Sequence, residues 1–338
     1  MKLYAAIDLH SNNSVLVVID EEDRIMYEKR LANDLQLIVQ ALSAFRAQLV
    51  GVVIESTYNW YWLVDGLMEA GYRVHLANTT AIQQYQGLKY TNDEHDARWL
   101  AKMLRLNILP VGYIYPKEAR AVRDLLRRRM QLMRQRTANL LSLGNQLTRV
   151  TGRQFGRKEI KEITAEQIAE RIEDANVGSA LKANLAVVQV LDTEIERLER
   201  EVLAQVKLAA QFQPLLSIVG IGKILALTIM LETGAIERFE KVGNFASYAR
   251  CVDSKRISNN KKKGENNAKC GNAYLSWAFA EAATFAIRYS PKAKRFFERK
   301  RAKVSTPVAY KALAHKLARA AYYVMRDRVP FDEARVFG

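Results

Sequence analysis

Short apolar runs alternate with helical patterns through the first hundred residues. Runs at 3–8, 14–19 and 25–30 have the length and composition of β-strands. A helical pattern over 33–48 follows, and then come a buried strand at 49–54, a helix at 59–70 and a strand at 72–76. This order predicts an α/β domain over residues 1–112, with helices packed on a mixed sheet.

Acidic residues open the next helical pattern, TNDEHDARWLAKML at 91–104. Asn92 is a predicted N-cap, and Asp93 and Asp96 lie three residues apart, so they project from one face of the helix. Two carboxylates held that close repel each other unless a cation lies between them, which makes the pair a candidate metal site. The alternative is that the helix macrodipole favours aspartate in a first turn, where water solvates it.

Two further acids end predicted strands, because Asp8 closes the first strand and Glu55 follows the buried fourth one. Ligand sites in open α/β sheets form beyond the strand ends, and the helix at 91–104 can pack beside them. We therefore expect the four carboxylates to converge on Mg²⁺ or Mn²⁺, which prefer hard oxygen ligands. This arrangement resembles the RNase H or RuvC-like nuclease fold, in which two metals are bound. Each histidine of the same motifs, His10 and His95, could touch a phosphate, although a polar neighbour of the acids is the more common role.

A long basic helical pattern begins at Pro116 and runs to about residue 150. It has an apolar stripe and many arginines with few acids. That imbalance is not typical of a solvated charged face, so we favour a helix that follows nucleic-acid phosphates. The arginines expected to contact phosphate are Arg127, Arg128, Arg129, Arg134 and Arg136.

An apolar seam with steps of three and four residues follows over 181–202, within a helical region at 113–210. It predicts about three heptads of coiled coil. The seam could pack against the basic helix of the same chain or against another subunit. Long amphipathic helices usually need a partner, so we favour a homodimer or homotetramer. The members of the seam are Leu181, Asn184, Val188, Leu191, Ile195, Leu198 and Val202.

The pattern of residues 211–338 predicts a mostly helical C-terminal domain. Its Val219-Gly220-Ile221-Gly222 turn joins two apolar helical stretches and resembles a helix-hairpin-helix, in which glycines let backbone N–H groups face a phosphate. Lys223 beside the turn favours DNA binding over the alternative, a tight turn in a core. Further helices are expected at 239–251, 272–289 and 308–326.

The segment 252–271 has almost no apolar residues, several asparagines and a lysine run, and it is predicted to be a loop. One interpretation is a flexible basic loop that binds phosphate. The other concerns Ser258, whose hydroxyl could attack a phosphodiester while nearby cations stabilise the developing charge. The segment has no histidine to act as a base, so composition alone does not make Ser258 a nucleophile. The expected nucleic-acid contacts of the segment are Lys255, Arg256, Lys261, Lys262 and Lys263.

The overall charge narrows the classes of partner. Lys and Arg number 52 against 36 Asp and Glu, and the net charge of +16 points to nucleic acid or an acidic membrane surface. No apolar run reaches transmembrane length, and the first residues form a strand pattern rather than a signal peptide. Cys251 and Cys270 form no CxxC motif, and histidines are too few for a structural zinc site. We therefore expect a cytoplasmic protein with reduced thiols and no membrane contact.

Motifs spread over nearly the whole chain resemble the DEDD transposases of bacterial insertion sequences of the IS-one-ten and IS-eleven-eleven type. The Lys-rich segment and the NAYLSWAF stretch after it resemble the eleven-eleven branch most. The motifs that carry the resemblance are IDLH around Asp8, VVIEST around Glu55, TNDEHDARWLA around Asp93 and Asp96, VGIGKILALTIMLETG, and KRISNNKKKGENNAKCGNAYLSWAFAEAATFA.

The resemblance implies a RuvC-like domain in which Asp8, Glu55, Asp93 and Asp96 bind divalent metal. It also implies a C-terminal transposase domain, a noncoding guide RNA that pairs with element-end and target DNA, and dimers or tetramers. These enzymes are RNA-guided serine recombinases, which cut DNA through a covalent phosphoserine and exchange strands through a Holliday junction.

The serine of this family implies a nucleophile at Ser258. The family usually has Ser-Gly at this point, whereas Asn259 follows the serine here, and Ser254 is the alternative. Two other functions stay open. One is a RuvC-like junction nuclease or site-specific DNA invertase, and in the nuclease water replaces the serine. The other is a nucleic-acid-binding protein without catalysis, for which the basic helices suffice.

Overall fold

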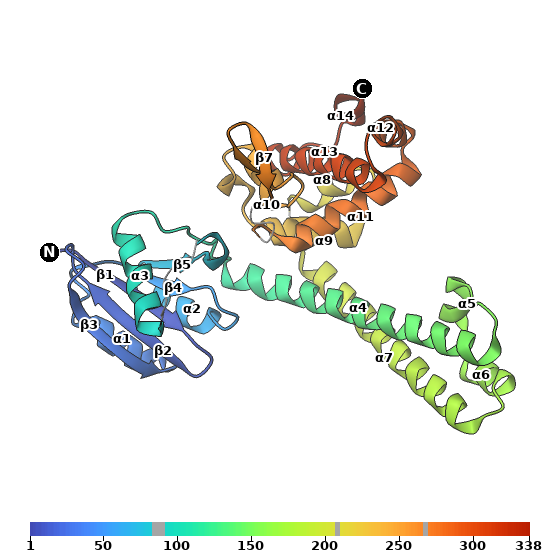
Figure 1. Cartoon of the computed structure of the whole chain (residues 1–338), viewed down its shortest axis with the longest axis horizontal. Coiled ribbons are helices and arrows are strands. Elements are labelled where there is room, and N and C mark those ends of the chain that lie inside the picture. The colour runs from blue at the N-terminus through green and yellow to red at the C-terminus, as the bar shows by residue number, and fades with distance from the viewer. Residues whose placement is uncertain (83–91, 207–209, 266–269) are drawn as a thin grey trace. The chain divides into compact units, whose positions relative to one another are not determined.

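A computed structural model describes residues 1–82, 92–206, 210–265 and 270–338 (Figure 1). Thr91, the first residue of the acidic helical pattern, lies outside these ranges. The chain forms two compact units. The N-terminal unit comprises Met1–Lys117 with Ser254–Cys270, and the C-terminal unit comprises Glu118–Asp253 with Gly271–Gly338. The three-part division at 1–112, 113–210 and 211–338 stays a prediction.

A five-stranded mixed sheet in the order β3-β2-β1-β4-β5 forms the centre of the N-terminal unit. The first three strands are an antiparallel meander, and β4 and β5 run parallel to β1. The predicted order of strands and helices is confirmed. The elements are β1 (Leu3–Leu9), β2 (Asn13–Ile19), β3 (Ile25–Ala32), α1 (Leu35–Ser43), β4 (Leu49–Glu55), α2 (Tyr61–Glu69), β5 (Val74–Ala77), η1 (Thr79–Ala81) and α3 (Asp93–Arg105).

Helices cover both faces of this sheet, and the alternation of strand side chains decides which residues face which helix. Leu3, Ala5 and Ile7 of β1 pack with residues of α1 and α2 on one face. Ala6 packs with residues of α3 on the other face. Even-numbered positions of β1 therefore face α3, and Asp8 belongs to that set.

The C-terminal unit is helical throughout its described part. Its helices are α4 (Lys117–Thr151), α5 (Arg157–Glu162), α6 (Ala165–Arg171), α7 (Ala175–Val206), α8 (Phe212–Leu216), α9 (Lys223–Thr233), η2 (Ile236–Arg238), α10 (Val242–Tyr248), α11 (Ala273–Tyr289), α12 (Pro291–Arg301), α13 (Thr306–Asp327) and α14 (Glu333–Phe337). The core of this unit is built mainly from α8 to α13, and Phe245 and Phe279 are its largest fully buried side chains. None of the described helices is long and apolar enough to cross a membrane.

The predicted apolar seam lies on α7 and packs on α4 of the same chain (Figure 1). Leu181 of the seam shares a buried cluster with Leu143 and Leu147 of α4. Asn184, the polar member of the seam, donates from Nδ2 to Ser142 Oγ at 3.2 Å. The seam therefore closes an intramolecular helical hairpin, which is one of the two alternatives that the pattern left open.

The prediction of a loop over 252–271 is wrong for its centre. Strands β6 (Arg256–Ser258) and β7 (Lys261–Gly264) pair as a short antiparallel hairpin. Asn259 and Asn260 form its two-residue turn with φ of 49° and 55°. Two consecutive residues with positive φ make a tight turn that suits hairpins, and asparagine tolerates this conformation. The side chains of the hairpin are exposed, so the pair of strands needs no apolar face and its sequence shows no apolar alternation.

Candidate active site

Two acids lie side by side at the carboxyl ends of adjacent parallel strands. Ile7 of β1 is paired with Ile54 of β4, so the next residues, Asp8 and Glu55, are neighbours across the strand pair. Alternation turns both side chains toward α3, because Ala6 and Val53 two residues earlier pack on that helix. Asp8 is only 3% exposed, so its carboxylate is held inside the fold.

Helix α3 brings two more acids to this edge of the sheet. As predicted, Asn92 is its N-cap, accepting a hydrogen bond at Oδ1 from the His95 backbone N–H at 2.9 Å. Asp93 and Asp96 follow in the first turn and are half-exposed. Helix α3 packs chiefly on β1 and β2, which places its N-terminal turn beside the end of β1.

The charges at this edge interact strongly. Burial raises the pKa of Glu55 to about 8, and a hydrogen bond with Asp8 and the negative charges of Asp8 and Asp96 add to the effect. Two adjacent carboxylates with no cation between them share a proton rather than ionise together. The structure thus brings Asp8, Glu55 and Asp96 into one electrostatic group.

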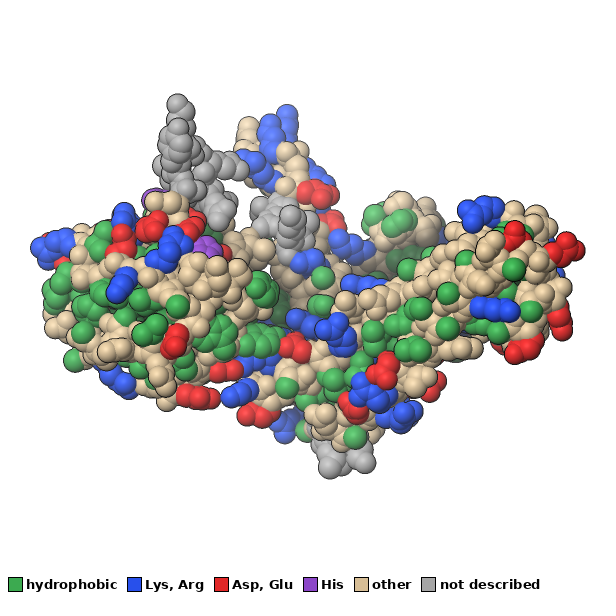
Figure 2. All heavy atoms as spheres, turned by 90° about the horizontal axis from the view of Figure 1, so that it is seen from below, with side chains coloured by type: hydrophobic (Ala, Val, Ile, Leu, Met, Phe, Trp, Pro, Cys, Tyr) green, Lys and Arg blue, Asp and Glu red, His purple; other side chains and the backbone are tan. Residues whose placement is uncertain are grey.

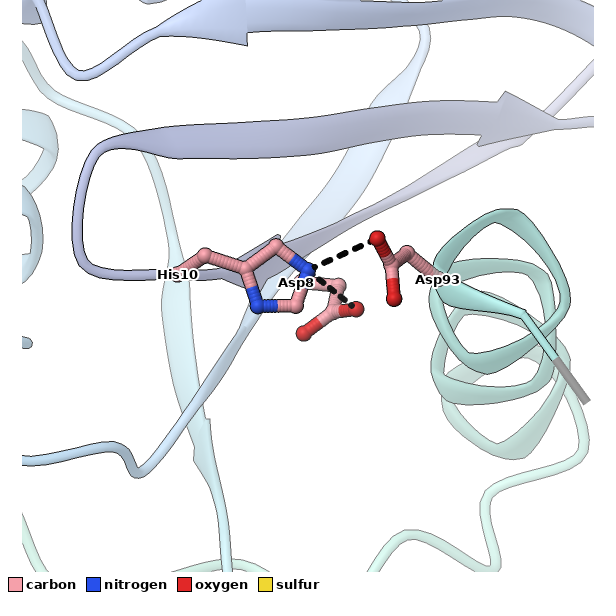
Figure 3. A group of neighbouring side chains, drawn as sticks. All are labelled: Asp8, His10 and Asp93. Carbon is pink, nitrogen blue, oxygen red and sulfur yellow. Dashed lines mark ion pairs between the residues drawn. The ribbon is translucent and has the colours of Figure 1, made fainter.

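His10 joins Asp93 to this group. The imidazole lies at the end of β1 near the start of α3, and the carboxylates of Asp8 and Asp93 both lie beside the same ring nitrogen (Figure 3). Its Nε2 is 3.4 Å from Asp8 Oδ2 and 3.1 Å from Asp93 Oδ2. One ligand atom from each of these three residues lies within 4.8 Å of the other two. All four predicted acids therefore converge, with a histidine among them.

A basic side chain, Arg30, neutralises part of the negative charge at the exposed edge of the cluster. Arg30 of β3 donates from Nη2 to Asp93 Oδ2 at 2.8 Å and to Glu94 Oε1 at 3.1 Å. The hydrogen bond from Arg30 holds the pKa of Asp93 below its usual range. Figure 2 shows acidic, basic and histidine side chains gathered on one face of the N-terminal unit. The pKa of Asp93 is thus lowered by its basic neighbour, whereas the pKa of Glu55 is raised by burial.

The donor set fits a divalent cation. Carboxylates from two strand ends and a helix N-terminus gather at this edge of the sheet, and oxygens are the ligands that Mg²⁺ and Mn²⁺ prefer. A cation there would offset the negative charges of Asp8 and Asp96, which add to the effect of burial on the pKa of Glu55. Asp8, Glu55, Asp93 and Asp96 are the acids that would hold it.

Ser258 lies at the tip of the β6–β7 hairpin. It is paired with Lys261 across the two-residue turn and is exposed. The predicted basic contacts of the segment, Lys255, Arg256, Lys261, Lys262 and Lys263, are exposed as well. Ser254 differs, because it is half-buried and its Oγ is shielded from solvent.

Three of the predicted phosphate-binding arginines of α4 form ion pairs inside the C-terminal unit. Arg127 pairs with Glu232, Arg129 with Glu199 and Arg136 with Asp192. Their side chains are 31%, 11% and 20% exposed. Arg128 and Arg134 are exposed on the same helix. The structure therefore divides the five arginines into three that join helices and two that face solvent.

The glycine turn before α9 has a packing role. Gly220 has φ of 86°, and a Cβ there would lie 2.2 Å from the carbonyl oxygen of Ala282 in α11. Gly222 is the N-cap of α9, and a Cβ added there would meet no atom of the described chain within 4 Å. Lys223 beside it is exposed. Only glycine suits position 220, whatever the turn binds.

Sequence reasoning missed the residues that order the cluster around the acids. The sequence predicts His10 as a polar neighbour of the acids or a phosphate contact, and it gives no role to Arg30. The signal that could have found His10 is its position two residues after Asp8, which keeps it on the same side of an extended chain. Arg30 has no comparable signal, because it meets Asp93 from 63 positions away.

Comparisons with known proteins agree with these motifs. A family model for DEDD transposases of the IS110 type, described as a transposase, matches residues 5–151. A second, described as "Transposase IS116/IS110/IS902 family", matches residues 213–298. The chain is also 27% identical over 235 residues to a "Probable family 20 transposase" of Pseudomonas aeruginosa, covering 68% of each protein. The chain belongs to the IS110-type DEDD transposases, a family of DNA-cleaving and rejoining enzymes that use divalent metal.

Proposed function

We propose that this transposase cuts and rejoins DNA through Ser258, with divalent cations held by Asp8, Glu55, Asp93 and Asp96. The observation that carries the proposal is the gathering of the four acids at one edge of the sheet, where burial and then the neighbouring acids Asp8 and Asp96 raise the pKa of Glu55 to about 8. Such a site is electrostatically incomplete without a cation. Bound there, Mg²⁺ or Mn²⁺ polarises a phosphodiester and favours loss of a proton from an attacking hydroxyl.

Ser258 is the nucleophile in this proposal. Its Oγ forms a bond to the phosphorus, the bond from phosphorus to one deoxyribose oxygen breaks, and the leaving oxygen takes up a proton. Exposure at the tip of a hairpin gives Ser258 access to a DNA strand, whereas the Oγ of Ser254 is shielded. The hairpin lysines and Arg256 would bind the adjacent phosphates.

Nucleic-acid binding by the helical unit is part of the same proposal. Arg128 and Arg134 on α4 and Lys223 at the start of α9 are exposed cations that could contact phosphate without reading sequence. The turn at Gly220 and Gly222 would act as a helix-hairpin-helix. A noncoding guide RNA that pairs with the element ends and target is the partner that the family resemblance favours.

Assembly into a homodimer or homotetramer also belongs to the proposal. Although the seam of α7 packs on α4, other apolar side chains of this hairpin are exposed, including Leu141 at 63%, Val187 at 47% and Val190 at 64%. Long helices with a second apolar stripe are typical of coiled coils that contact further helices.

A cleavage assay with magnesium, element-end DNA and the noncoding RNA of the element tests the mechanism. A DNA–protein adduct on a denaturing gel is expected for the parent and for Ser254→Ala, and it should be absent from Ser258→Ala and Asp96→Asn. Cleavage that survives Ser258→Ala but not Asp96→Asn would identify a water-using junction nuclease. A third outcome would identify a protein without catalysis. In that case the parent binds DNA but neither binds metal nor cleaves, and Asp8→Asn leaves DNA binding unchanged.

A further inference from the structure

The nitrogen of His10 that faces the acids is in an unusual position. Its Nε2 is shielded from solvent and makes no hydrogen bond of regular geometry within the described part of the chain. Yet carboxylate oxygens of Asp8 and Asp93 lie 3.4 and 3.1 Å away (Figure 3). A shielded nitrogen this close to two carboxylate oxygens can share one cation with them. We propose that His10 is a metal ligand of this site, binding through Nε2 a divalent cation that it shares with Asp8 and Asp93.

The spacing of the three ligand atoms suits one cation. In octahedral geometry, ligands at about 2.1 Å from the ion lie about 3.0 Å from their nearest neighbours. The separations of 3.1 and 3.4 Å from Nε2 to the two oxygens are close to that value. This inference rests on the proposed metal site, and it adds a nitrogen donor to a set of acids.

The backbone around His10 is held so that the imidazole stays in place. The carbonyl oxygen of His10 accepts hydrogen bonds from Asn33 Nδ2 at 3.0 Å and from Asn59 Nδ2 at 2.9 Å. Its backbone N–H donates to the Asn13 carbonyl oxygen at 2.9 Å. Ser14 Oγ in turn donates to Asn33 Oδ1 at 2.6 Å. Three segments therefore fix residue 10 at the end of β1, as a preorganised ligand requires.

Arg30 connects the two sides of the proposed ligand group. Its Nη2 donates to Asp93 Oδ2 at 2.8 Å, and its Nη1 donates to Asn13 Oδ1 at 2.8 Å. One guanidinium thus links a metal-binding acid with the turn that holds His10. Second-shell contacts of this kind orient ligands before a metal arrives.

A nitrogen donor has a consequence for metal choice. Imidazole is a better ligand for Mn²⁺ than for Mg²⁺, which prefers oxygen alone. His10 should therefore raise the affinity of the site for Mn²⁺ more than the affinity for Mg²⁺. Asp8, Glu55, Asp93 and Asp96 would bind either ion.

Pulsed electron paramagnetic resonance of the full chain with Mn²⁺ tests the assignment directly. Coupling of the bound Mn²⁺ to a ¹⁴N nucleus is expected for the parent protein. It should vanish in His10→Gln and His10→Asn, and it should persist in His95→Gln. His95 is the matched control because its Nδ1 lies 3.7 Å from Asp96 Oδ1, in the same cluster of acids. Mn²⁺ affinity should fall at least about tenfold in His10→Gln, with a smaller loss for Mg²⁺.

The outcomes separate this inference from the proposed metal site. Mn²⁺ that binds the parent and is lost in Asp8→Asn, but never couples to ¹⁴N, would overturn His10 as a ligand and leave the acid site intact. Coupling that survives both His10 variants would assign the nitrogen to another residue and overturn it too. A parent that binds no Mn²⁺ would contradict both. Thermal unfolding without metal checks that each variant is folded.

Discussion

Arg127 and Glu232 form a two-pronged ion pair that joins α4 to α9. Arg127 donates from Nε to Oε1 at 2.6 Å and from Nη2 to Oε2 at 2.7 Å. The Glu232 side chain is only 2% exposed, and Asn272 donates a third hydrogen bond to it at 2.7 Å. Asn272 is also the N-cap of α11, so one carboxylate connects three helices.

Glu232→Gln is expected to destabilise the C-terminal unit. Breaking a buried pair leaves one charge uncompensated, which costs about 3–5 kcal/mol. Arg127 is partly exposed, so water would offset some of this cost and we expect about 2–3 kcal/mol. Denaturant unfolding measures the loss. The control is Arg128→Ala one residue along α4, which should change stability by less than about 0.5 kcal/mol; equal losses in the two variants would contradict the pair's role.

Replacing Arg128 and Arg134 together with alanine is expected to weaken DNA binding without lowering stability. Both side chains are exposed, and each phosphate contact contributes about one unit to the slope of log affinity against log salt concentration. The slope should therefore fall by about two units, measured by fluorescence anisotropy from low to moderate salt. An unchanged slope would show that α4 does not contact phosphate through these side chains.

The ion-paired arginines provide the contrast for that experiment. Arg129→Ala should lower the melting temperature, because the side chain is 11% exposed and paired with Glu199 at 2.5 Å. Its effect on the salt slope should be smaller than that of the exposed pair. A larger effect would mean that Arg129 leaves Glu199 when DNA binds.

Glu55→Gln is expected to stabilise the metal-free protein at alkaline pH. The folded chain raises the pKa of Glu55 from 4.5 to about 8, so the folded state binds this proton more tightly than the unfolded state. Ionising Glu55 therefore lowers the free energy of unfolding. This loss of stability is absent below pH 4.5, grows between pH 4.5 and 8, and is complete above pH 8. Each loss of about 1 kcal/mol in the free energy of unfolding lowers the melting temperature by roughly 2–4 °C.

Melting curves at pH 5 and pH 9 test this charge effect. The variant should melt close to the parent at pH 5 and above it at pH 9, and saturating Mg²⁺ should remove the advantage. Glu94→Gln is the control, because Glu94 pairs with Arg30 and the acids that raise the pKa of Glu55 are Asp8 and Asp96. A difference that is independent of pH would mean that packing, rather than charge, separates the variants.

Much of this architecture follows from local patterns. Alternation and helical periodicity predict the strands and helices of the N-terminal unit, and Asn92 is a cap that its sequence position reveals. Asp8 and Glu55 could be predicted to meet because parallel strands end at the same edge of a sheet. The β6–β7 hairpin was missed because it has no apolar face, although Asn259-Asn260 is a turn signal.

The pairing of charges could not be predicted in the same way. Arg127 and Arg129 look alike on the basic face of α4, but their partners lie 105 and 70 positions away. Long-range ion pairs depend on which helices pack together, and composition does not reveal this. The same limit applies to His10, whose role depends on where α3 begins in space.

The two cysteines are expected to react at very different rates. Burial raises the pKa of the Cys251 thiol to about 12, so almost no thiolate forms at neutral pH. Burial also keeps an alkylating reagent away from this sulfur. Cys270 is half-buried. Iodoacetamide should therefore modify one thiol of the folded protein and two in guanidinium, and peptide mapping should assign the fast site to Cys270. A fast phase that remains in Cys270→Ser would contradict the burial of Cys251.

Gly220→Ala should destabilise the C-terminal unit while Gly222→Ala is tolerated. Alanine at position 220 would adopt φ of 86° and place its Cβ 2.2 Å from the Ala282 carbonyl oxygen, so strain and overpacking together should cost at least about 2 kcal/mol. Alanine at the open N-cap position 222 should cost less than about 1 kcal/mol. Lys223→Ala completes the set, because a helix-hairpin-helix contact predicts weaker DNA binding at unchanged stability. If Lys223→Ala binds DNA as the parent does and only Gly220→Ala unfolds, the turn is a packing feature and the DNA contact lies elsewhere.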